Sequence, residues 1–237
     1  MMRSCLAGLL LVAACCAAPM LRAEAQPAEI IILRHAEKAD NFRLCPAGTQ
    51  RSLALVKQYL GRDARDSLFP ASQPPAAFFA VSLHTLETAT PAATSWGLPL
   101  ITYSVLPASP EDFALALNQA TRRAAHDVLT NPRWTGKTIV MVWEHDHIAH
   151  SNLKTRFPGE PVMLRQLLHL DRLPGVPKDW WGSNYDYFWI VRYDRPGSDS
   201  PTSFRMVRQD FVPGQPALAA NAWGAPRLSG TAPGCER

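Results

Sequence analysis

Several features that would place this chain in a special class of protein are scarce or missing from its sequence. Charged residues make up only 19% of the 237 residues, and the formal net charge of +4 comes without a cluster of Lys and Arg. This argues against a nucleic-acid partner, because binding to nucleic acid needs a basic patch. The chain also lacks polar low-complexity tracts and internal repeats, and 47% of its residues are hydrophobic. We therefore expect a folded chain rather than a disordered or fibrous one.

Hydrophobic runs long enough to span a bilayer are missing too. The longest run, Leu6 to Ala18, is shorter than the roughly 20 residues that a transmembrane helix needs. It follows Arg3 and precedes an A-x-A tripeptide at 23–25, an order typical of a cleaved signal peptide. We therefore expect residues 1–25 to be an export signal and residues 26–237 to form a single domain in the periplasm or outside the cell.

Cysteine is scarce beyond this leader. Three of the five cysteines lie within the first 25 residues, which leaves only Cys45 and Cys235. An exported chain with two thiols can pair them, so we expect a disulfide, with two separate thiols as the alternative. Within the leader, the tetrapeptide that ends at Cys15 resembles a bacterial lipobox. Lipidation at Cys15 and anchoring to a membrane face is therefore the alternative to cleavage after Ala25.

Strand patterns alternate with helix patterns along the rest of the chain. Apolar runs of strand length occupy residues 29–33, 76–83, 138–143, 187–193 and 204–211. Helices are expected over Gln50–Leu60 with Leu53 on the apolar stripe, in a segment that Gly97 ends, in a segment capped by Ser109, and over Pro161–Leu170. This alternation predicts an α/β fold, a three-layer α/β/α sandwich with a mostly parallel central sheet. The two most apolar strands, 29–33 and 138–143, are expected to be neighbours at its centre.

Both of these strands run directly into chemically reactive residues. The first is followed by Arg34-His35-Ala36-Glu37-Lys38 and the second by Glu144-His145-Asp146-His147. Ligands of open α/β sheets bind beyond the carboxyl ends of the strands, so these two segments should share one pocket. An imidazole can form a covalent phosphoryl intermediate, and a guanidinium fits phosphate oxygens. The alternative for Arg34-His35 is a salt-bridged arginine beside a hydrogen-bonded structural histidine.

The stretch I-I-L-R-H-A-E-K resembles the signature of the histidine phosphatase superfamily, whose fold is phosphoglycerate mutase-like. The similarity continues through Leu44-Cys45-Pro46-Ala47-Gly48 with Arg51, through Thr88-Ala89-Thr90-Pro91, and through Trp143-Glu144-His145. These motifs keep the order and spacing of the family between Glu29 and about Tyr193. The resemblance implies a phosphomonoesterase that acts on a small phosphorylated substrate without a metal or other cofactor.

The resemblance also implies roles for individual residues. His35 would be the nucleophile that becomes phosphorylated, and Arg34 and His145 would bind phosphate oxygens. The family carries a second Arg four residues before the Thr that matches Thr88, and here that position is His84. Loss of an arginine that binds phosphate oxygens can cost about 3 kcal/mol of transition-state stabilisation. Protonated His84 or Lys38 would have to compensate, and both are candidate substrate ligands.

Three acidic residues are candidates for the proton donor. In one branch of the family it is an Asp directly after the second catalytic His, which matches Asp146; Glu37 and Glu144 are alternatives in the same pocket, where Glu144 would also contact substrate. Asp146 could instead cap a helix.

Two other functions are alternatives to phosphatase activity. Because the second Arg is missing, the chain could be a member of the family that binds phosphate without catalysing its transfer. The three imidazoles of His145, His147 and His150, next to two acids, could hold zinc or a similar metal. Because His145 ends a strand while the other two would share a helical face, their convergence is not required by the sequence.

Overall fold

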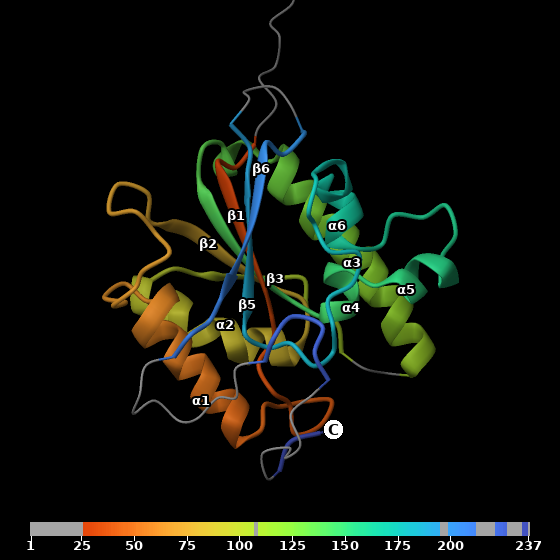
Figure 1. Ribbon diagram of the computed structural model, residues 1–237, viewed down its shortest axis with the longest axis horizontal. Helices are drawn as coiled ribbons and strands as arrows, with labels where there is room; N and C mark the ends of the chain where they lie inside the picture. Colours follow the sequence, from red (N-terminus) through yellow and green to blue (C-terminus); the bar gives the residue numbers. More distant parts are fainter. Residues whose placement is uncertain (1–25, 107–108, 195–198, 212–220, 227–233, 237) are drawn as a thin grey trace, which may run out of the picture.

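The structure is a computed structural model that describes residues 26–106, 109–194, 199–211, 221–226 and 234–236. The expected export signal, with Cys15, lies outside these residues. A central sheet with strand order β3-β2-β4-β1-β5-β6 is covered by helices on both sides (Figure 1). Its strands are β1 (Glu29–Arg34), β2 (Pro75–Ala80), β3 (Leu100–Thr102), β4 (Thr138–Trp143), β5 (Tyr187–Arg192) and β6 (Ser203–Arg208). The helices are α1 (Pro46–Leu55), α2 (Leu83–Trp96), α3 (Pro110–Thr130), α4 (His145–Ile148), α5 (Ser151–Arg156) and α6 (Leu164–Leu167), with a π-helical turn at Val56–Leu60 and 3-10 turns at Pro132–Trp134 and Leu170–Arg172.

Most of the sheet is parallel. β1 pairs with β4 in parallel, from Glu29 opposite Thr138 to Arg34 opposite Trp143, and β4 and β3 pair with β2 in the same way. β5 runs antiparallel to β1, and β6 runs antiparallel to β5. The predicted α/β/α sandwich is therefore confirmed, as is the central position of β1 beside β4.

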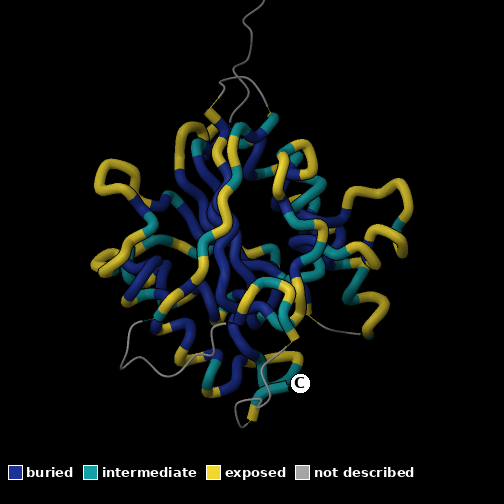
Figure 2. Tube along the Cα trace, viewed as in Figure 1, coloured by how far each residue is buried: buried dark blue, intermediate teal, exposed yellow. Residues whose placement is uncertain are grey.

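The apolar run of β1 is explained by burial on both faces of the sheet. Ile30 and Ile32 belong to the core under α3 and α6, whereas Ile31 and Leu33 belong to the core under α1 and α2. All four side chains are fully buried, and Figure 2 shows the same burial along the central strands. Successive side chains of a strand point to opposite faces, so a strand between two helical layers needs no polar side.

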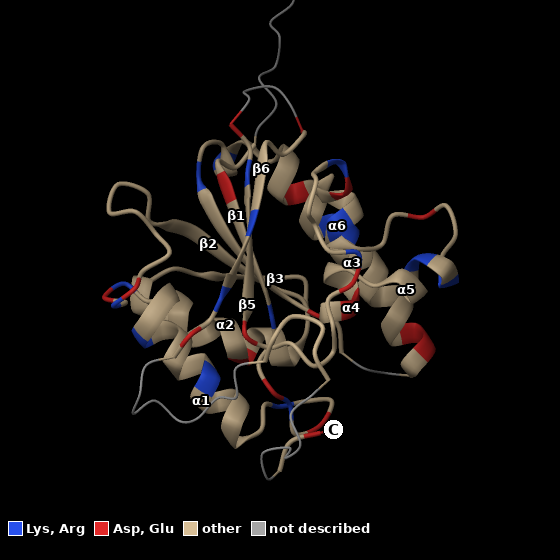
Figure 3. Ribbon diagram, in the orientation of Figure 1, with Lys and Arg blue, Asp and Glu red and all other residues tan. Residues whose placement is uncertain are grey.

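The boundaries of α2 and α3 follow the predicted signals. Gly97 ends α2 with a φ of 65°, the left-handed conformation that glycine adopts without strain. The Ser109 side chain accepts a hydrogen bond from the backbone N–H of Asp112, 3.2 Å away, at the start of α3. Neither these nor the other helices in the described part of the chain combine the length and hydrophobicity of a membrane span. Basic residues are spread over several elements and do not gather into one patch in this view (Figure 3).

The predicted helix over Gln50–Leu60 is wrong in its start and in its buried face. α1 begins four residues earlier, at Pro46, and the chain continues after Leu55 as a π-helical turn. Of the predicted apolar stripe, Leu60 is buried but Leu53 is 49% exposed, whereas Arg51 is only 2% exposed. The buried Arg51 guanidinium is paired with the carboxylate of Glu37.

The predicted helix over Pro161–Leu170 is wrong in length. Only α6 is helical there, and His169 has a φ of 59°. A left-handed residue cannot continue an α-helix, so the chain turns after Leu168. Leu164 and Leu168 are still fully buried, as the pattern indicated.

Candidate active site

The polar residues at the carboxyl ends of three parallel strands form one group. His35 follows β1, Glu144 and His145 follow β4, and the loop after β2 brings His84 to the same edge. The backbone N–H of His35 donates to the Trp143 carbonyl, 3.1 Å away, so the two strand ends stay paired as far as the site. The structure therefore brings these side chains together at the edge of the sheet where strand order predicts a ligand site.

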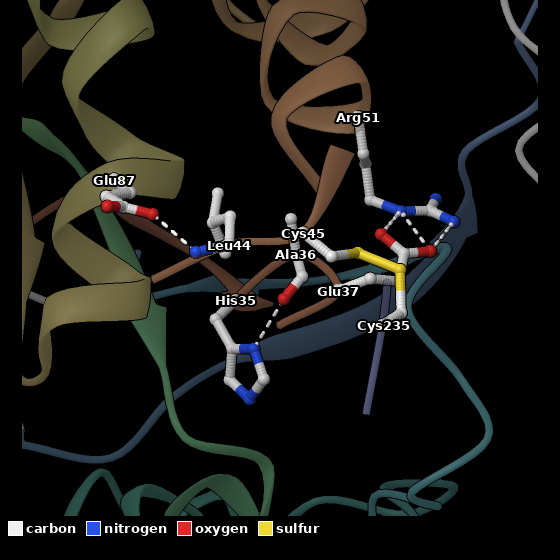
Figure 4. The surroundings of a disulfide bond; sticks show 8 residues. All are labelled: His35, Ala36, Glu37, Leu44, Cys45, Arg51, Glu87 and Cys235. Atoms are coloured by element: carbon white, nitrogen blue, oxygen red, sulfur yellow. Dashed lines mark hydrogen bonds and ion pairs between the residues drawn. A yellow bond between two sulfur atoms is a disulfide. The ribbon is translucent and has the colours of Figure 1, made fainter. Parts of the chain in front are cut away.

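His35 is buried, with 1% of its surface exposed. Its Nδ1–H donates to the carbonyl of Ala36, 2.6 Å away (Figure 4). Burial lowers the pKa of the His35 imidazole, although the Glu144 carboxylate opposes this shift. The other ring nitrogen, Nε2, faces the Glu144 carboxylate, with 3.3 Å between Nε2 and Oε2. The loop after His35 is fixed by the Thr88 hydroxyl, which accepts from the Ala36 N–H at 2.9 Å.

Glu144 lies between two imidazoles. Its Oε1 accepts a hydrogen bond from the Ser82 hydroxyl at 2.6 Å and lies 3.7 Å from His84 Nδ1. Burial alone would raise the pKa of this carboxyl, but His35, His84 and Ser82 together hold it well below its usual range. Glu144 is therefore ionised in the free protein.

His84 lines the same pocket. Its ring centroid lies 5.5 Å from that of His35, and its Nε2–H donates to the Asp40 carbonyl at 2.6 Å. The position follows from the start of α2, where Ser82 is the N-cap and forms a capping box with Thr85. The structure thus brings His84 into the group around His35 and Glu144.

Arg34 lies beneath the pocket and is only 4% exposed. It donates to the Gly182 carbonyl at 2.6 Å and to the Tyr185 hydroxyl at 3.1 Å, and its guanidinium carbon lies 3.8 Å from the centre of the Tyr185 ring. The sequence did not predict these two partners, because the loop that carries them has no recognisable motif. Their only sequence signal is an aromatic residue and a glycine shortly before β5.

His145 and Asp146 form a pair at the rim of the pocket. His145 Nε2 lies 3.2 Å from Asp146 Oδ1, and the two rings of His145 and His35 are 6.4 Å apart. Burial, followed by the charges of Arg34 and His35, lowers the pKa of His145 to about 2, so its ring is neutral. Glu144 occupies the N-cap position of α4, and Asp146 lies in the first turn. The alternative of Asp146 as a helix cap is therefore wrong.

Glu37 faces away from the nucleophile. Arg51 binds its carboxylate with three hydrogen bonds of 2.7 to 3.1 Å, and Figure 4 shows this pair on the far side of the loop from the His35 ring. Burial would raise the pKa of Glu37, but the Arg51 charge lowers it overall. Glu37 is thus committed to an ion pair and is not placed to protonate a leaving group at His35.

Lys38 is engaged by the C-terminal end of the chain. Its Nζ lies 3.1 Å from Glu236, and the Glu236 N–H donates to the Lys38 carbonyl at 2.8 Å. The neighbouring Cys235 forms a disulfide with Cys45, with a Cα to Cα distance of 5.1 Å (Figure 4). The structure therefore ties Lys38 to this C-terminal contact.

The alternative metal set of His145, His147 and His150 is not assembled. His147 points under α3, where its Nε2 lies 2.9 Å from Asn118 Oδ1 and burial lowers its pKa to about 4. His147 lies two residues after His145 in α4, so the two side chains point to different sides of this helix. His150 Nε2 lies 3.7 Å from Asp146.

Comparisons with known proteins give a distant structural likeness. No protein-family model and no curated protein matches the chain. A mycobacterial glucosyl-3-phosphoglycerate phosphatase, solved with VO3, is 14% identical with a TM-score of 0.39, over 76% of this chain and 97% of that one. A structure described as mycobacterial hydrolase 2 is 14% identical with a TM-score of 0.39, over 78% and 92%. An Escherichia coli protein assigned provisionally as an alpha-ribazole-5'-P phosphatase is 12% identical with a TM-score of 0.42, over 77% and 97%. Likeness at this level does not assign an activity, so the chemistry is argued from the site.

Proposed function

We propose that the chain is a phosphomonoesterase of the histidine phosphatase superfamily and that His35 Nε2 is its nucleophile. The observation that supports this most directly is the hydrogen bond from His35 Nδ1–H to the Ala36 carbonyl, because it fixes the ring and leaves Nε2 as the nitrogen available for attack. Arg34 and His145 lie beside it as ligands for phosphate oxygens. Substrate specificity, which the loops around the pocket would set, is left open.

The proposed reaction has two displacement steps and needs no metal. In the first step the Nε2 lone pair attacks phosphorus, the bond from phosphorus to the ester oxygen breaks, and that oxygen takes a proton from an acid. In the second step a water oxygen attacks the phosphohistidine, the bond from nitrogen to phosphorus breaks, and the water proton returns to the carboxylate. The products are an alcohol and inorganic phosphate, and the protein is unchanged.

We assign the proton donor to Glu144. Its carboxyl group belongs to the group around the nucleophile, 3.3 Å from His35 Nε2, whereas Asp146 contacts the outer nitrogen of His145. Glu144 is ionised in the free protein, but the negative charge of an incoming phosphate favours its protonated form. Substrate binding would therefore favour protonation of Glu144, which can then act as the acid.

The direct test is to trap the intermediate. The protein is mixed with a ³²P-labelled phosphate monoester and quenched in base, which preserves phosphohistidine, and the labelled peptide is sequenced by mass spectrometry. Label on His35 is the expected result. Turnover without label on any histidine would contradict the mechanism.

A second candidate is a relative that binds phosphate without turning over esters. It is supported by His84 in place of an arginine and by the carboxylate of Glu144, which opposes an anion next to His35. In that case inorganic phosphate would raise the melting temperature, as any ligand of the folded state does, while a broad panel of phosphate esters stays intact.

The substitution His84→Arg should separate these candidates. A guanidinium keeps its charge at every working pH and offers a two-pronged contact, so kcat/KM near neutral pH should rise by at least about tenfold. The matched control is His126→Arg, which adds the same charge on the exposed face of α3. If both substitutions leave phosphate binding and turnover unchanged, position 84 does not contact the substrate.

We also propose that the mature chain works outside the cytoplasm, since a disulfide persists in oxidising compartments. Cys45 and Cys235 are separated by 190 residues, and closing a loop of this length stabilises a fold by about 2–5 kcal/mol. Cys235→Ser should therefore lower the free energy of unfolding in urea by about this amount under oxidising conditions. Adding a reductant should remove most of the difference between the variant and the parent protein.

A further inference from the structure

The three imidazoles around Glu144 share one hydrogen-bonding pattern. Each has an outer nitrogen held by an acceptor. His35 Nδ1 contacts the Ala36 carbonyl at 2.6 Å, and His84 Nε2 contacts the Asp40 carbonyl at 2.6 Å. His145 Nε2 contacts Asp146 Oδ1 at 3.2 Å. In each ring the outer nitrogen is thus occupied by an acceptor, and the inner nitrogen is left to face the centre of the group.

The inner nitrogens have no hydrogen-bond donor in the described part of the chain. His84 Nδ1 and His145 Nδ1 are buried without a hydrogen-bond partner, and His35 Nε2 faces the carboxylate of Glu144. Three imidazole nitrogens and one carboxylate therefore meet in a buried space that the guanidinium of Arg34 also influences. Buried polar atoms normally have partners, and a metal ion that displaces any proton from these nitrogens would supply one.

The geometry suits a tetrahedral metal ion. One donor atom from each of His35, Glu144 and His145 lies within 4.8 Å of the other two. Bonds of about 2.0–2.1 Å in a tetrahedron place neighbouring donor atoms about 3.3 Å apart. The separation of His35 Nε2 and Glu144 Oε2 is already 3.3 Å, and the His145 donor lies within 4.8 Å of the other two.

We propose that His35, Glu144 and His145 bind one divalent transition metal ion, with Zn²⁺ as the preferred cation. Two imidazoles and a carboxylate are a common zinc ligand set that leaves a fourth position open. The carbonyl of Ala36 and the carboxylate of Asp146 are the kind of outer partners that orient metal-binding histidines.

Binding of the ion and phosphoryl transfer exclude each other, because both use the lone pair of His35 Nε2. Zn²⁺ is therefore an inhibitor that a phosphate ester competes with, and a chelator restores turnover. This consequence rests on the proposed phosphatase activity, whereas the metal site does not.

The test uses the full mature chain, stripped of metal by a chelator and dialysed. Zn²⁺ is titrated by calorimetry, and Co²⁺ is titrated by its visible absorption, which is intense only in tetrahedral coordination. We expect one ion per chain in the parent protein. His145→Gln and Glu144→Gln should each weaken binding by at least about 100-fold, since each removes a direct ligand. His126→Gln, at an exposed histidine of α3, should bind as the parent does.

The outcomes distinguish the two proposals. Unchanged Zn²⁺ affinity in His145→Gln and Glu144→Gln, or no binding by the parent protein, overturns the metal site whatever the phosphatase assay gives. Site-specific binding in a protein without phosphatase activity supports the metal site and overturns only the proposed function. Loss of phosphatase activity on adding Zn²⁺, with recovery on adding chelator, supports both.

Discussion

His35→Asn should lower kcat/KM for phosphate monoesters by roughly 10³-fold or more, and no phosphorylated intermediate should form. Asparagine is close to histidine in size and polarity, so it fills the same buried space beside Arg34. It has no nucleophilic lone pair, and therefore the first displacement step is lost. The measurement is steady-state hydrolysis of several phosphate esters, followed by release of inorganic phosphate.

The matched control is His126→Asn, which removes an exposed imidazole far from the site. Circular dichroism melting of both variants would show whether the fold is kept. Equal turnover in His35→Asn and the parent protein would contradict a phosphohistidine at this position. Equal loss in both variants would show that the assay reports on stability instead of chemistry.

The parts of this site that could be predicted are those fixed by single strands. A fully apolar strand has to lie between two helical layers, and its carboxyl end then opens into the crevice of the sheet. This was enough to bring Arg34, His35 and His145 together from two strands that are more than 100 residues apart. Pattern and topology thus predict which backbone segments meet.

The parts that could not be predicted depend on which way a side chain turns. Glu37 and Lys38 follow the nucleophile directly, yet Arg51 and Glu236 draw them to the other side of the loop. Tyr185 and Gly182 reach Arg34 from about 150 positions away. Such partners leave no periodic signal, because a single ion pair or carbonyl contact between distant segments places no demand on the residues beside it.

The same limit explains why the sequence does not select the proton donor from the three candidate acids. Glu37, Glu144 and Asp146 all lie within two residues of a candidate catalytic imidazole in the sequence. In the structure they face three different partners, which are the guanidinium of Arg51, the inner nitrogen of His35 and the outer nitrogen of His145. Only the second of these partners is the atom that we propose attacks phosphorus. The choice of proton donor is therefore a question of orientation, which a substitution can test.

Glu144→Gln should lower kcat for an alkyl phosphate by about 10²-fold or more but should affect 4-nitrophenyl phosphate only slightly. An alkoxide is a poor leaving group and needs a proton as the ester bond breaks, whereas nitrophenolate leaves without one. The amide keeps the size of the side chain and can still contact Ser82, so the fold should tolerate it. Asp146→Asn is the matched control, and its kcat should change by the same factor for the two esters. If Asp146→Asn instead loses only the alkyl phosphate, the donor is Asp146, and the proton must reach the leaving group from the rim of the pocket.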